Sequence, residues 1–281
     1  MDTRYAANPK DFKHYTTEDM RSEFLIEELF IKGSIKGVYS HVDRMIVIGA
    51  VPTDKELSLQ DVCDPKKDLG SDYFLFNREM GILNIDEGKG IVTLDGDKYE
   101  LGKYDCLYVG RGTENVTLSA VDPEDPPKFY MVSCPAHKAY PSKFISRDMA
   151  DCTRAGSAEA SNDRYIYKYI NPAVLETCQL SMGVTPLINN SVWMTMPAHT
   201  HERRMEVYLY NDLPDGQVIF HMMGEPDETR HIVMKNQQAV ISPSWSIHSG
   251  CGTHSFTLIW SMAGENKEFA DMDMIEPEDI R

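Results

Sequence analysis

Three residues in the C-terminal half of the chain have the types and spacing of a metal site. Segment 197–210 reads PAHTHERRMEVYLY, in which His199 and His201 are two residues apart. Because side chains alternate along a strand, these two imidazoles face the same side of an extended chain. A turn at residues 202–204 would bring Glu206, at the start of a second strand, beside them. This local pattern predicts three ligands that converge on one point.

A fourth candidate ligand lies far downstream. His248 stands in the segment SPSWSIHSG, just past a turn, where a barrel could close it on the first cluster. Three imidazoles and one carboxylate suit a borderline divalent ion, so we expect one metal ion per subunit, with Zn favoured over Mn, Fe, Co or Ni. The alternative is a set of structural histidines without metal, as a lone pair of histidines on a strand often is.

The elements that must position these residues read mainly as β-strands. One helix is expected near the N-terminus, where Thr16 or Thr17 can cap a turn that carries Glu18 and Asp19. Strands are then expected at 38–50, 73–76 and 81–85, and Asp95-Gly96 is a strong hairpin signal. A second series of strands is expected across 178–260. The pattern predicts two β-barrel units in tandem, and their similarity suggests a duplication.

The division of the chain is expected to follow its composition. Residues 148–163 are polar and contain Gly, Ser and Asn, which is typical of a linker. We therefore expect an N-terminal barrel without metal ligands at 1–145, a linker and packing segment at 146–172, and a metal-binding barrel at 173–281. The first β unit has neither an HxH pair followed by Glu nor a late histidine.

Charge and composition exclude several classes of partner. The net charge of −16 argues against binding to nucleic acid or to an anionic membrane surface, because both need clustered Lys and Arg. No apolar run approaches the ~18 residues that span a bilayer, and the first residues show no signal-peptide pattern. Six scattered cysteines without a CxxC pair are expected to be free thiols of a soluble protein in a reducing compartment.

The pattern of His199, His201, Glu206 and His248 resembles the two motifs of the cupin superfamily, although Trp245 follows Pro243 where a glycine is usual. The sequence around these residues resembles a narrower group of proteins within that superfamily. Four segments closely resemble the bacterial 5-keto-4-deoxyuronate isomerases, which are 4-deoxy-L-threo-5-hexosulose-uronate ketol-isomerases of pectin breakdown. They read ETCQLSMG (176–183), MPAHTHERRMEVY (196–208), HMMGEPDETRHIVM (221–234) and ISPSWSIHSG (241–250). YSHVDR (39–44) and residues 81–112 resemble the same family.

The resemblance implies an all-β chain of two tandem cupin-type jelly-roll β-barrels with minor helices, in which only the second barrel holds metal. It also implies a cytoplasmic homo-oligomer, as a hexamer. The implied reaction converts 5-dehydro-4-deoxy-D-glucuronate to 3-deoxy-D-glycero-2,5-hexodiulosonate in pectin or uronate catabolism. Its substrate is a small deoxy-uronate, and the enzyme would be an intramolecular oxidoreductase.

Such a ketol-isomerase needs a base for the C2 proton and a cation for the substrate carboxylate. The sequence leaves the base open among a hydroxide on the metal, Glu176, Tyr208 and His221. Candidate substrate-binding residues are Arg164, Lys168, Gln179, Arg203 and Trp245, and Arg204 and Trp260 are further candidates. For the cations the alternative is an ordinary solvated surface position, and for the apolar groups it is core packing.

Two other functions remain open at this level. Cupins with the same ligands bind iron and cleave substrates with dioxygen, and the ligand types do not fix the metal. Other cupins bind sugars without catalysis, but storage members usually lack the ligands that this chain retains. Both alternatives can be separated from an isomerase by assay.

Overall fold

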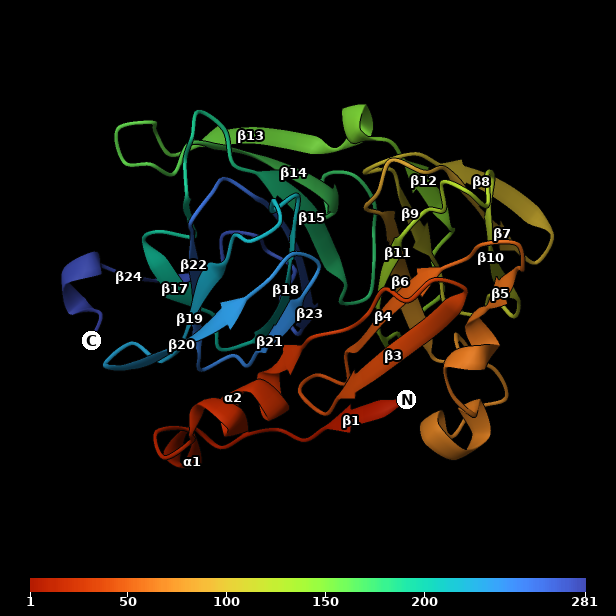
Figure 1. Cartoon of the computed structure of the whole chain (residues 1–281). Helices are drawn as coiled ribbons and strands as arrows, with labels where there is room; N and C mark the ends of the chain where they lie inside the picture. The colour runs from red at the N-terminus through yellow and green to blue at the C-terminus, as the bar shows by residue number, and fades with distance from the viewer. The chain divides into compact units, whose positions relative to one another are not determined.

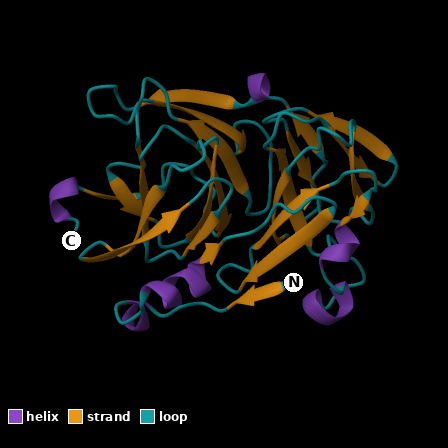
Figure 2. Cartoon of the chain, viewed as in Figure 1, coloured by secondary structure: helices purple, strands orange, loops and turns teal.

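The computed structural model describes residues 1–281, which form two compact units whose regular secondary structure is mainly β-strand (Figures 1 and 2). The first unit comprises Met1–Thr3, Glu28–Ala150 and Tyr169–Leu180, and the second comprises Arg4–Glu27, Asp151–Lys168 and Ser181–Arg281. The units are therefore not consecutive along the chain, which differs from the expected division at residues 145 and 172. No helix is long and apolar enough to cross a membrane.

The first unit contains two sheets around one apolar core. Its strands are β1 (Asp2–Arg4), β3 (Ser34–Ser40), β4 (Ile46–Val51), β5 (Leu57–Ser58), β6 (Arg78–Asn84), β7 (Gly90–Leu94), β8 (Asp97–Leu101), β9 (Cys106–Val109), β10 (Val116–Ala120), β11 (Phe129–Pro135) and β12 (Lys143–Ile145). Seven of them pair in the order β1-β3-β4-β11-β6-β9-β12, and four in the order β5-β10-β7-β8. Core side chains such as Phe74, Met80 and Leu107 are fully buried between the sheets.

The second unit contains two sheets of the same sizes and a short extra pair. Its strands are β2 (Leu25–Ile26), β13 (Asp151–Ala155), β14 (Arg164–Ile170), β15 (Ser181–Pro186), β16 (Trp193–Met194), β17 (Ala198–Thr200), β18 (Arg204–Asn211), β19 (Ile219–Glu225), β20 (Glu228–Met234), β21 (Ala239–Ser242), β22 (Ile247–Gly252), β23 (Thr257–Gly264) and β24 (Asp273–Ile275). The larger sheet runs β13-β14-β15-β23-β18-β21-β2, the smaller β16-β22-β19-β20, and β17 pairs with β24.

The two units share one strand order, and the register of their central strands can be compared directly. β6 begins with Arg78 and β18 with Arg204. Two residues later, Met80 lies opposite Val109 at the end of β9, as Glu206 lies opposite Ser242 at the end of β21. Met80, an apolar core residue of the first unit, thus occupies the position that Glu206 has in the second unit.

The N-terminal helices belong to the second unit because their apolar side chains pack there. α1 (Pro9–Phe12) and α2 (Thr17–Phe24) lie against β19, β20 and β21 (Figure 1). The Thr16 side chain accepts a hydrogen bond from the Asp19 amide, and the Asp19 side chain accepts one from the Thr16 amide, which is the cap that the sequence predicts. Phe12, Met20 and Phe24 join the core of the second unit.

Several expected elements differ from the structure. Residues 38–50 form not one strand but the end of β3, a turn in which Asp43 and Arg44 have positive φ, and most of β4. Residues 73–76 form a bend and a turn rather than a strand, and within them Phe74 and Leu75 pack into the core of the first unit while Phe76 is exposed. The segment 146–172, expected as a linker and packing segment, contains the strands β13 and β14, which are joined by the loop 156–163 and extend the larger sheet of the second unit. The Asp95-Gly96 hairpin between β7 and β8 is confirmed. The remaining short helices are η1 (Leu59–Val62), η2 (Pro65–Leu69), η3 (Arg147–Met149) and η4 (Pro277–Asp279).

The position of α1 leads to a stability prediction. Phe12 is 1% exposed, and its ring packs edge-on against Phe24 and Trp245. We expect Phe12→Ala to lower the free energy of unfolding of the second unit by about 3–5 kcal/mol, because it removes a buried ring and leaves a cavity. Urea unfolding followed by tryptophan fluorescence measures this. Phe220→Ala, on β19 and 39% exposed, is the matched control and should cost clearly less. Equal effects of the two substitutions would contradict this account of the N-terminal segment.

Candidate metal centre

The four predicted ligands gather at one end of the second barrel. β17 carries His199, the turn after it carries His201, and the inward face of β18 carries Glu206. β22 brings His248 to the same point from the smaller sheet. Their ligand atoms all lie within 4.8 Å of one another, and the four residues are between 1% and 9% exposed. These residues form a buried cluster that could hold a metal ion.

The hydrogen positions within the cluster show why it suits a cation. Nδ1 of His201 lies 2.9 Å from the carbonyl oxygen of Arg204, which only accepts, so Nδ1 carries the hydrogen of the neutral ring. Nε2 of His201 therefore directs a lone pair at Oε2 of Glu206, 3.0 Å away. Nε2 of His248 is 3.0 Å from that same oxygen and 3.0 Å from Nε2 of His199. Electron-pair donors thus face one another across a small space, and a shared cation would remove their repulsion.

Burial makes protonation a poor source of that positive charge. Desolvation lowers the pKa of His199 to about 2 and lowers the pKa of His248, and the neighbouring imidazoles oppose protonation further. Burial raises the pKa of Glu206, and the neighbouring His248 and His201 lower it, so that it lies below its ordinary value. Neutral imidazoles beside an ionised carboxylate are the protonation states that a divalent ion requires.

A second layer of contacts holds the ligands in place. Besides the Arg204 carbonyl at His201, the Ser242 hydroxyl lies 3.3 Å from Nδ1 of His248. The guanidinium of Arg204 donates to four carbonyl oxygens of residues 266–271 at 2.6–3.3 Å. This C-terminal segment continues into β24, in which Met274 pairs with His199. Partners of this kind fix the orientation of metal ligands.

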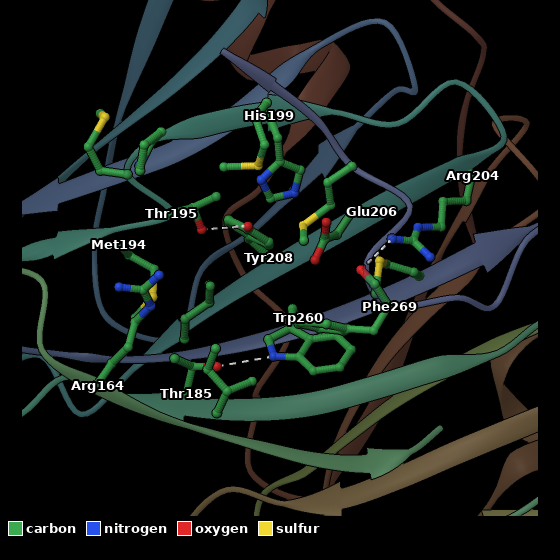
Figure 3. Close-up of a pocket in the computed structure, with 17 residues that line it drawn as sticks. Arg164, Thr185, Met194, Thr195, His199, Arg204, Glu206, Tyr208, Trp260 and Phe269 are labelled. Carbon is green, nitrogen blue, oxygen red and sulfur yellow. Dashed lines mark hydrogen bonds between the residues drawn. The ribbon is translucent and has the colours of Figure 1, made fainter. Parts of the chain in front are cut away.

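The cluster opens into a cavity of about 150 Å³ in the second unit (Figure 3). That volume is below the ~300–1,000 Å³ typical of sites for drug-sized ligands, so the cavity suits a small metabolite. His199 and Glu206 reach it from the cluster, and its wall is otherwise mainly apolar, with Trp260 and Phe269 among its rings. Outside the cluster its polar lining is sparse and includes the side chains of Arg164, Thr195 and Tyr208.

Two predicted residues lie where they could act on a ligand. The Tyr208 hydroxyl is 2.8 Å from that of Thr195, and burial together with the charge of Glu206 raises its pKa well above the ordinary value. Arg164 donates from one nitrogen to the carbonyl of Asn162 at 2.7 Å, and burial lowers the pKa of its guanidinium. In Figure 3 the Tyr208 hydroxyl lies between the Arg164 guanidinium and the Glu206 carboxylate.

Other predicted residues do not reach the cavity. Glu176 is exposed on the first unit, where Gln179 also lies with its side-chain amide on the Pro135 carbonyl. Of the candidates in the second unit, Trp245 packs on Phe12, and His221 is fully buried with its ring on Tyr210.

The remaining cations are occupied elsewhere in the second unit. Lys168 pairs with Asp151 at 2.7 Å, and Arg203 is paired with Asp271. These predictions were wrong for one reason: the local sequence does not show which side chains of a barrel line the cavity at its end. The sequence reasoning missed Thr195, Phe269, Met272 and Met274, and the last three follow no periodic pattern that could have indicated them.

A family model described as the KduI/IolB family matches residues 51–277. The chain belongs to this family. A curated protein of Lachnoclostridium phytofermentans, named 4-deoxy-L-threo-5-hexosulose-uronate ketol-isomerase, is 53% identical over 281 residues, which is 100% of both chains. A protein of Escherichia coli with the same name is 50% identical over the same length.

Two solved structures show the fold class. An IolB-like protein from Salmonella typhimurium superposes with a TM-score of 0.67 at 14% identity, covering 82% of this chain and 87% of the other. Bacillus subtilis oxalate decarboxylase, described with Mn(II) centres, superposes with a TM-score of 0.53 at 10% identity, covering 82% and 71%. The all-β fold of two cupin-type jelly-roll barrels is thereby confirmed.

The geometry of the cluster predicts the effect of losing one ligand. We expect His248→Ala to weaken divalent metal binding by more than ~100-fold, since even partners outside the ligand set contribute 10–100-fold. Metal content after dialysis, measured by mass spectrometry of the full chain, tests this. The exposed His254, changed to Ala, is the matched control and should leave metal content unchanged. Retention of metal by His248→Ala at the wild-type level would show that the cluster is not the metal site.

Proposed function

We propose that this protein is a metal-dependent ketol-isomerase that acts on 5-dehydro-4-deoxy-D-glucuronate, which is 4-deoxy-L-threo-5-hexosulose uronate. The observation that carries the proposal is full-length identity of about half to relatives that bear this name, combined with the buried cluster of His199, His201, Glu206 and His248. The product is 3-deoxy-D-glycero-2,5-hexodiulosonate, formed by moving a carbonyl from C1 to C2.

The reaction is a balanced internal redox change. One proton leaves C2, and another is added at C1, while the C2 hydroxyl loses its proton and the C1 oxygen gains one. C2 is oxidised and C1 is reduced, so no external oxidant or reductant takes part. The difficult step is the build-up of negative charge on the two oxygens when the C2 proton leaves. A divalent ion held by the four ligands would supply Lewis-acid stabilisation of that charge.

Arg164 is proposed to bind the substrate carboxylate. Its guanidinium lines the cavity on the side away from the ligand cluster, as Figure 3 shows. Only one of its nitrogens is used by the Asn162 carbonyl, which leaves further N–H groups for a ligand. A guanidinium can bind a carboxylate through two parallel hydrogen bonds, which would orient an open-chain uronate with its carbonyl end toward the cluster.

Tyr208 is proposed to hold and move a proton at a substrate oxygen. Its raised pKa keeps the hydroxyl protonated near neutral pH, so it acts as a hydrogen-bond donor rather than as a base. The Thr195 hydroxyl, 2.8 Å away, fixes its direction and can exchange a proton with it. Glu176 and His221 are not proposed for the C2 proton, since neither lines the cavity.

Finer features of the proposal rest on the donor set and on resemblance. Zn is the proposed ion because three imidazoles and one carboxylate suit it, and Mn, Fe, Co and Ni accept the same donors. A homohexameric assembly, a cytoplasmic location and a role in pectin degradation are proposed from the resemblance to the uronate isomerases.

A direct assay tests the proposed activity. The metal-loaded enzyme, incubated with the deoxy-uronate and followed by ¹³C NMR, should convert the C1 aldehyde signal into a C2 ketone signal. We expect His248→Ala to lower kcat by about 100-fold or more, as for loss of charge stabilisation elsewhere, with His254→Ala unaffected. No conversion by the metal-loaded wild type would contradict the proposal, and oxygen uptake with iron bound would favour a dioxygenase instead.

The two pocket residues should differ in which constant they change. Arg164→Ala should raise KM by about 10–100-fold, because a charged hydrogen-bond pair contributes roughly 1.5–3 kcal/mol, and Arg164→Lys should restore part of it. Tyr208→Phe should lower kcat by about 100-fold with little change in KM. Tyr165→Phe, next to Arg164 but outside the cavity, is the control. Steady-state kinetics in which Arg164→Ala leaves KM unchanged would remove Arg164 from the carboxylate site.

A further inference from the structure

The first unit has a cavity of its own, of about 230 Å³, beside the start of β6. Arg78 lines it and occupies, by strand register, the position that Arg204 has in the second unit. The cavity therefore lies at the barrel end that corresponds to the metal centre, in a barrel whose interior is filled by apolar side chains. Nothing in the proposed isomerase reaction uses this cavity.

Arg78 is a buried cation without a carboxylate partner. It is 6% exposed, and its hydrogen bonds go to the Ser133 hydroxyl, the Ser133 carbonyl and the Arg44 carbonyl at 2.5–3.1 Å. All of these are neutral groups. Burial lowers its pKa to about 10, so it stays charged at neutral pH. A buried charge normally has an opposite partner, because its desolvation is costly.

A comparison with Arg204 shows which nitrogen donors of Arg78 have no hydrogen-bond partner. In the second unit the guanidinium of Arg204 is covered by four carbonyl oxygens of the C-terminal segment. The first unit has no such covering on Arg78, whose bonds use Nε and Nη2 and leave Nη1 without a partner. That nitrogen is not fully enclosed by protein, and Arg78 faces the cavity.

Three other unused donors line the same cavity. The exposed guanidinium of Arg44 makes no hydrogen bond or ion pair, and neither does the Tyr39 hydroxyl. The Asn77 oxygen accepts from Arg111 at 2.6 Å, which leaves the Asn77 amide hydrogens for a ligand. The opposing group is Asp68, an exposed carboxylate that accepts from the Asp64 amide at 3.1 Å. Two guanidinium groups and two neutral donors outweigh it.

We propose that this cavity in the first barrel is a second binding site, which takes a small anion with carboxylate or phosphate oxygens between Arg78 and Arg44. The anion would supply the missing counter-charge of Arg78 and accept hydrogen bonds from Tyr39 and Asn77. Such a site stands apart from the metal centre and holds whether or not the isomerase proposal is correct. It gives the barrel without metal ligands a binding role in a protein whose net charge of −16 repels anions elsewhere.

The test is calorimetric titration of the full chain with inorganic phosphate and, separately, with D-glucuronate. A form with both His248→Ala and Arg164→Ala is used as the background, so that neither the metal centre nor the proposed carboxylate site at Arg164 contributes. We expect saturable binding of one of the two anions, one per chain, and loss of at least about tenfold in affinity with Arg44→Ala. Lys98→Ala removes the same charge from an exposed position of the same unit and should change affinity by less than about twofold.

The outcomes are distinct. Binding of phosphate alone identifies a phosphate site, and binding of glucuronate alone identifies a carboxylate site. Absence of saturable binding of both anions at up to about 20 mM would overturn the proposal. So would equal affinity of the Arg44→Ala and Lys98→Ala forms, which would show that the cavity is not where the anion binds.

Discussion

The mutual repulsion of buried electron-pair donors is the constraint on which the second barrel depends. His199, His201, His248 and Glu206 direct their ligand atoms at one point, in surroundings where protonation of the imidazoles is disfavoured. Such an arrangement is costly to fold without a cation, since several polar atoms lose water and gain no opposite charge. Metal binding and the stability of this end of the barrel are therefore expected to be coupled.

The rest of the second unit can be understood as support for that point. β17 and β24 hold His199 in a strand pair, and Arg204 ties the segment between β23 and β24 to the strand that carries Glu206. The same segment supplies Phe269, whose ring packs at a tilt against Trp260 at the cavity wall. The geometry of the candidate ligands and the shape of the cavity thus depend on one set of contacts, so that a change in the C-terminal segment would affect both. The first barrel keeps the strand order and the leading arginine of β6 but has Met80 where the carboxylate would be.

The ligand cluster could be predicted from the sequence because three of its four residues lie close together in the chain. An HxH pair, a turn and a glutamate fix three ligands within eight residues, and only His248 needed an assumption about barrel closure. The N-terminal helix was equally readable from its cap. The assignment of residues 4–27 to the second unit could not be predicted. Phe12, Met20 and Phe24 show that the segment has apolar side chains to bury, but not which barrel they pack against. The predicted cavity residues were partly wrong for the same reason. Gln179 and Lys168 have side chains that could bind a carboxylate, but contacts with residues distant in the sequence give their polar groups other partners.

If the cluster of His199, His201, Glu206 and His248 holds the metal ion, X-ray absorption at the metal edge will show these ligands. We expect a first shell of nitrogen and oxygen only, at about 2.0–2.2 Å, with the multiple-scattering signature of three imidazoles. In any metal that the His248→Ala form retains, this signature should fall to two imidazoles. A first shell that contains sulfur, or fewer than three imidazoles in the wild type, would show that the metal ion is bound elsewhere.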